Sequence, residues 1–132
     1  TSVPGIFACG NVLHVHDLVD YVSEEAALAG RSAAAYIQGV HTDRGTPIPI
    51  RAKGGVRYTV PNTVRPGEGR ITLRLRVDDV YKNKVLAVCA GETRILSKKA
   101  RVLAPGEMET LLLDRSLLQG CKEITVTLEE DA

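Results

Sequence analysis

Strict alternation of apolar and polar residues over positions 70–79 limits the fold of this chain more tightly than any other feature of the sequence. In the stretch RITLRLRVDD, every second residue is apolar, at Ile71, Leu73, Leu75 and Val77. A period of two is the period of a β-strand with one buried face. The stretch therefore predicts a half-buried strand and argues against a helix at these positions.

Six further runs of strand-forming residues accompany this one, separated by turn sequences such as RPGEG and YKN. They are GVRYTVP, KVLAVCA, TRILSKK, ARVLA, METLLLD and EITVTLEE. Seven short strands at this spacing predict a mainly β domain over residues 56–132, an antiparallel β-sandwich of immunoglobulin-like shape. The residues expected in its core are Ile71, Leu73, Leu75, Val77, Leu111, Leu113, Ile124, Val126 and Leu128.

A different pattern precedes the strands. Residues 18–38 contain good helix formers and no proline, with Asp17 or Asp20 available as N-cap and Gly39 placed as C-cap. The stripe expected to be buried consists mostly of small residues, namely Val22, Ala26, Ala29, Ala33 and Ile37, flanked by Ala27, Gly30 and Ala34. Such a helix gains little from apolar area and suits close approach to a sheet. The Pro- and Gly-containing residues 40–55 are expected to form a linker.

Composition excludes several classes of function. The net charge of the 132 residues is +1 and aromatic residues make up 4%, so neither a basic field nor stacking platforms for nucleic acid are expected. Apolar runs are shorter than the roughly 18 residues that span a bilayer, so membrane insertion is not expected. The three widely spaced cysteines, Cys9, Cys89 and Cys121, favour a reducing, cytoplasmic setting.

The first eleven residues carry a motif. TSVPGIFACGN resembles the last flavin-binding motif of the FAD-dependent pyridine nucleotide-disulfide oxidoreductase family, T-x-x-P-G-[IV]-[FY]-A-x-G-D, which precedes the final helix of the FAD domain. The resemblance covers about residues 1–39 and implies a strand over GIFACG, a tight turn and a helix, which is a β-turn-α remnant of an FAD-binding α/β domain. It also implies cofactor contacts at Gly10, Asn11 and Val12, with Asn11 on a hydroxyl of the ribityl chain.

Two departures from the family motif matter for the site. Asn11 stands where the family has Asp, which keeps one acceptor, adds a donor and removes a negative charge. The loop VLHVHDLVD is longer than the usual link and brings His14, His16 and Asp17 toward the expected flavin position, as candidate catalytic or flavin-contacting residues. A purely structural role for the two histidines is the alternative. No metal site is expected, because His41 is the only other histidine in the sequence.

Two motifs of complete flavoprotein oxidoreductases are absent from this sequence. The sequence contains neither G-x-G-x-x-G nor C-x-x-C, so the resemblance implies that the nucleotide-binding fingerprints lie in upstream FAD- and NAD(P)-binding domains of the same polypeptide. The chain would then be the carboxy-terminal part of a flavoprotein that passes electrons from NAD(P)H to FAD and on to an unknown acceptor. By itself it would be inactive and would bind FAD weakly or not at all.

Two roles are open for the predicted sandwich. In the flavoprotein it would contact a second copy of the chain or another oxidoreductase subunit. The alternative is a non-enzymatic β-sandwich interaction module, in which the preceding helix is only a spacer.

Overall fold

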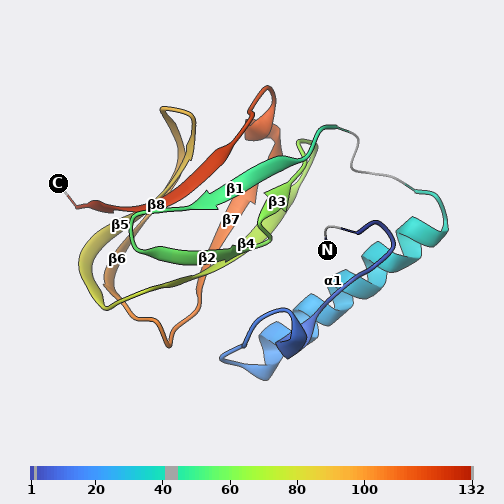
Figure 1. Cartoon of the computed structure of the whole chain (residues 1–132), viewed down its shortest axis with the longest axis horizontal. Helices are drawn as coiled ribbons and strands as arrows, with labels where there is room; N and C mark the ends of the chain where they lie inside the picture. The colour runs from blue at the N-terminus through green and yellow to red at the C-terminus, as the bar shows by residue number, and fades with distance from the viewer. Residues whose placement is uncertain (2, 41–44, 132) are drawn as a thin grey trace. The chain divides into compact units, whose positions relative to one another are not determined.

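The computed structural model describes residues 1, 3–40 and 45–131. The chain is mainly β and separates into two units, Thr1–Thr42 and Asp43–Ala132 (Figure 1). Among the described residues, no helix combines the length and the apolar character needed to cross a membrane.

The first unit contains a short 3-10 helix, η1 (Gly10–Val12), and the long helix α1 (Val19–Ile37). The N-cap of α1 is Leu18, not Asp17 or Asp20 as expected from the sequence, and the Leu18 side chain makes no capping bond. The other end agrees with the sequence. Gly39 has a positive φ of 68°, and its N–H donates to the Tyr36 carbonyl while the Val40 N–H donates to the Ala35 carbonyl. This pair of bonds is a Schellman motif, which ends the helix.

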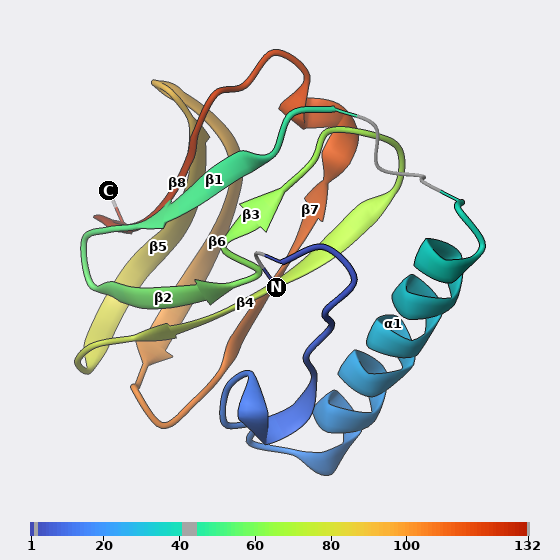
Figure 2. The same ribbon diagram turned by 45° about the vertical axis from the view of Figure 1, so that its right-hand side comes forward.

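The segment before η1 runs back along α1, as both views of the ribbon show (Figures 1 and 2). The Phe7 ring meets the Tyr36 ring edge to face, with centroids 6.0 Å apart. The strand expected over GIFACG is not formed, because residues 6–9 have no regular secondary structure. A β-strand needs a hydrogen-bonded neighbouring strand, and none of the described strands pairs with this segment.

The second unit consists of two sheets (Figure 2). One sheet has the strand order β3-β1-β8-β5-β6 and the other has the order β2-β4-β7. The strands are β1 (Ile48–Ala52), β2 (Val56–Val60), β3 (Thr63–Val64), β4 (Arg70–Val77), β5 (Tyr81–Ala90), β6 (Thr93–Leu103), β7 (Glu109–Asp114) and β8 (Ile124–Glu130), with a 3-10 helix, η2 (Arg115–Leu118), after β7.

Alternation along β4 places its apolar side chains in the core, as the sequence predicts. Leu73, Leu75 and Val77 are buried, and Leu73 lies opposite the buried Leu111 of β7. Fully burying a leucine side chain contributes about 1.5–3 kcal/mol. Both sheets supply the core cluster, which includes Leu86, Val88, Ile124 and Val126 of the five-stranded sheet. Ile71 and Leu128, also expected in the core, are half-buried at its margin.

The expected linker over residues 40–55 requires a correction. Residues 48–52 of this stretch form β1, which pairs in parallel with β8 and buries Ile48 and Ile50. The runs 93–99 and 100–104, expected as two strands, form the single strand β6, and β3 was not expected from the sequence.

Candidate functional site

A buried cluster of His14, His16 and Glu25 is the most concentrated group of chemically versatile side chains in the described part of the chain. The Nε2 atom of His14 lies 3.2 Å from Oε1 of Glu25, and the Nε2 atom of His16 lies 2.7 Å from Oε2. The Gly10 N–H donates to Oε2 of Glu25 at 2.8 Å. One carboxylate therefore faces three nitrogen atoms from the turn and loop that precede α1.

Local geometry explains why these residues meet. His14 and His16 are separated by Val15, which is 66% exposed, so the loop alternates between inward and outward side chains. Glu25 follows Val22 by three residues and precedes Ala29 by four, which places it on the same face of α1 as these two half-buried residues. Of the side-chain surfaces, 5% of His14, 1% of His16 and 7% of Glu25 is exposed.

The carboxylate of Glu25 is stabilised in its charged form. Burial alone would raise its pKa, but hydrogen bonds from His16, the Gly10 amide and His14, together with the charge interaction with His16, lower the pKa below the ordinary glutamate value. The ring centroids of His14 and His16 lie 4.4 Å apart. The arrangement can hold a cation or fix the turn at Gly10.

The residues expected to contact a cofactor lie beside this cluster. Gly10 has a φ of 70°, a left-handed conformation that favours glycine. Asn11 is exposed, and its Oδ1 atom accepts a hydrogen bond from the His16 N–H at 3.4 Å. Val12 is 84% exposed.

Two of the three members of the cluster are predicted from the sequence. His14 and His16 come together as candidate site residues, whereas Asp17 is exposed and is not one of the three converging side chains. Glu25 was missed because a glutamate in a helix is ordinarily solvent-exposed. A signal was present, since Glu25 falls on the stripe of Val22 and Ala29, where a charged residue needs a partner.

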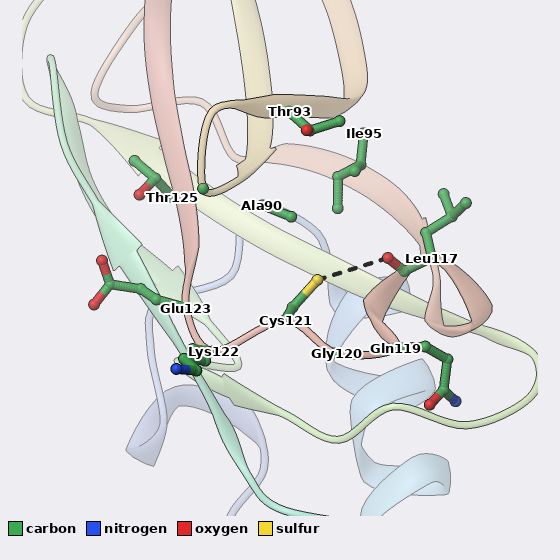
Figure 3. Close-up of a pocket in the computed structure, with 11 residues that line it drawn as sticks. Ala90, Thr93, Ile95, Leu117, Gln119, Gly120, Cys121, Lys122, Glu123 and Thr125 are labelled. Atoms are coloured by element: carbon green, nitrogen blue, oxygen red, sulfur yellow. Dashed lines mark hydrogen bonds between the residues drawn. The ribbon is translucent and has the colours of Figure 1, made fainter.

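The second unit has a shallower feature, an open pocket of about 500 Å³ beside Cys121 (Figure 3). The Cys121 thiol donates to the Leu117 carbonyl oxygen at 3.8 Å, and Lys122 and Glu123 also line the pocket. Glycine, alanine and threonine form much of its lining. The pocket therefore offers less chemistry than the cluster in the first unit.

No protein-family model, curated protein or solved structure matches the chain.

Proposed function

We propose that residues 1–39 form one wall of the flavin site of an FAD-dependent pyridine nucleotide oxidoreductase. The proposal depends above all on one observation: the second glycine of the motif TSVPGIFACGN, Gly10, has a left-handed backbone conformation with φ of 70° and is the first residue of η1, which lies between the motif and α1. This is the conformation that brings a backbone close to a ligand without a side chain between them.

Exposed apolar side chains on the first unit support the presence of a further covering surface. Val12 is 84% exposed, Val19 is 75% exposed and Ile37 is 83% exposed. Covering apolar surface contributes about 25 cal/mol for each Å² removed from water. The upstream FAD-binding domain would supply that surface, with the small residues of α1 allowing close approach to its sheet.

The residues at the turn have distinct roles in this proposal. Glu25 accepts from the Gly10 N–H and thereby fixes the turn, while the exposed Asn11 amide is available to a ribityl hydroxyl as donor or acceptor. Val12 would lie against the cofactor, and the positive end of the α1 dipole would favour negative charge on the reduced ring. Bound FAD would supply the chemistry, accepting a hydride from NAD(P)H and passing electrons to an acceptor.

The second unit would serve subunit or partner contact as an immunoglobulin-like sandwich. Its separation into sheets of five and three strands around one core supports this assignment. The alternative, a non-enzymatic interaction module in which α1 is a spacer, requires only the second unit. It assigns no role to the left-handed Gly10 or the buried Glu25.

The test is the flavin content of the polypeptide produced from the complete reading frame that contains this chain. We expect about one FAD per polypeptide, reduced by NAD(P)H, while the isolated chain binds FAD weakly or not at all. Gly10→Val should lower FAD occupancy several-fold, because a β-branched residue disfavours positive φ. Gly91→Val is the matched control, since Gly91 also has a positive φ, of 61°, but lies in the second unit.

Two results would refute the proposal. One is a complete reading frame that encodes no nucleotide-binding half, and the other is equal FAD occupancy in the Gly10→Val and Gly91→Val proteins.

A further inference from the structure

We propose that His14, His16 and Glu25 form a binding site for a divalent transition-metal ion, with Zn²⁺ as the first candidate. The proposal is independent of the flavin assignment, because it depends only on contacts within the first unit. The sequence alone predicts no metal site, because His41 is the only further histidine. The structure supplies a third ligand of another type, Glu25, from α1.

The distances from the two histidine nitrogens to Glu25 are slightly shorter than the spacing of ligands around one ion. Zinc binds histidine nitrogen and carboxylate oxygen at about 2.0–2.2 Å, so tetrahedral ligands lie about 3.4 Å from one another. The Nε2 atoms of His14 and His16 lie 3.2 Å and 2.7 Å from the nearest oxygen of Glu25, and the ligand atoms all lie within 4.8 Å of one another. Small side-chain movements would admit the ion between them.

The surroundings of the carboxylate resemble those of a metal ligand. All three side chains are more than nine-tenths buried, which orders them and restricts competition from water. Carboxylates that bind metals usually also accept a hydrogen bond from a neighbouring group of the protein. The Gly10 N–H provides such a bond to Oε2 of Glu25 at 2.8 Å.

The donor set also limits which ion fits. Two imidazoles and one carboxylate suit zinc and other first-row divalent ions rather than Ca²⁺ or Mg²⁺, which prefer oxygen ligands. Three protein ligands leave a fourth position for water or another small ligand, as in catalytic zinc sites.

The experiment is zinc binding to the 132-residue chain under reducing conditions, measured by competition with a chelator and by zinc X-ray absorption. We expect one Zn²⁺ per chain with nitrogen and oxygen ligands at about 2.0–2.2 Å and no sulfur ligand at about 2.3 Å. A shell of sulfur ligands in the spectrum would indicate binding elsewhere, because the free thiols of Cys9, Cys89 and Cys121 could bind the ion instead.

Variants locate the site. Glu25→Gln and His16→Ala should each weaken zinc binding by about tenfold or more, whereas Glu24→Gln, which removes the same charge at the adjacent and exposed position, should leave it unchanged. Circular dichroism of each variant reports whether α1 is retained. The X-ray absorption spectrum of the unmodified chain decides the matter even if a variant loses its helix. Absence of stoichiometric binding, a sulfur shell, or equal affinity in Glu25→Gln with α1 retained would overturn the proposal.

Discussion

Burying a carboxylate is costly unless hydrogen-bond donors replace its water, and Glu25 illustrates how the first unit meets this requirement. Its two oxygens face His14, His16 and the Gly10 N–H. Hydrogen bonds to a charged group contribute about 1.5–3 kcal/mol each, so removal of the carboxylate would loosen the loop and the turn together. The turn at Gly10, which carries the proposed flavin contacts, is thus fixed by the Glu25 side chain fifteen positions away in sequence.

The hydrogen bonds to Asp114 can be tested through their effect on its pKa. The carboxylate accepts from the Ser116 hydroxyl at 2.7 Å and from the Ser116 N–H at 3.0 Å, where it caps η2. These bonds, with a smaller contribution from the charge of Arg70, lower the pKa of Asp114 below its ordinary value. A lowered pKa favours the folded chain above the ordinary aspartate pKa of about 3.9, and this contribution is lost as the pH falls through the lowered value.

We therefore expect Ser116→Ala to raise the pKa of Asp114 toward the ordinary value, as measured by the carboxyl carbon shift in an NMR titration. Ser97→Ala in β6 is the control and should leave the titration unchanged. An unaltered Asp114 titration in Ser116→Ala would show that the hydrogen bond from the Ser116 hydroxyl does not hold the carboxylate in solution.

Among the elements, the turn between β1 and β2 depends on glycine. Gly55 has a φ of 93°, and a Cβ atom there would lie 2.8 Å from Cζ of Tyr81 and 3.0 Å from Cδ1 of Leu128. Gly106 has open space around it, with no heavy atom within 4 Å of the position of a Cβ atom. The two positions thus separate the effect of the turn from that of replacing a glycine.

Gly55→Ala should lower the free energy of unfolding of the second unit by about 1–3 kcal/mol, since it adds backbone strain to the close contacts. Gly106→Ala should change it by less than about 0.5 kcal/mol. Urea denaturation monitored by far-UV circular dichroism gives both values, and equal stability of the two variants would contradict this account of the turn.

The sequence predicts an element well where the residue pattern along that element alone determines its structure. The alternation along β4 and the helix-forming run of α1 both appear in the structure at nearly the expected positions. β1 was missed because Pro47 and Pro49 are typical of a linker. Ile48 and Ile50 alternate with these prolines and are buried, and β1 pairs with the distant strand β8. No local pattern encodes such pairing.

The candidate site was predictable in part for the same reason. The spacing of His14 and His16 is visible in the sequence, but their partner Glu25 is brought to them by the return of the chain along α1. Only its place on the small-residue stripe distinguished Glu25 from the exposed Glu24.

The two units of the molecule have different features: the second contains the hydrophobic core, and the first carries the proposed flavin contacts. Every member of the core cluster belongs to the second unit, from Ile48 to Val126. The first unit instead keeps large apolar side chains such as Val12 and Ile37 exposed. An exposed apolar surface of this kind favours association with another surface.

Residues 43–132 should therefore fold without the first unit. We expect this fragment to unfold cooperatively in urea, with a midpoint close to that of the second unit in the intact chain. It should be monomeric by light scattering even at concentrations at which the intact chain associates. A fragment that lacks a cooperative transition would show that the first unit contributes to the core.

The central claim, that residues 10–12 lie against a flavin, is tested most directly by an experimental structure of the polypeptide from the complete reading frame, determined with FAD present. We expect the Gly10 backbone and Val12 in van der Waals contact with the cofactor and the Asn11 amide hydrogen-bonded to a ribityl hydroxyl. FAD bound elsewhere, with Gly10–Val12 away from it, would contradict the claim, as would a structure that holds no flavin.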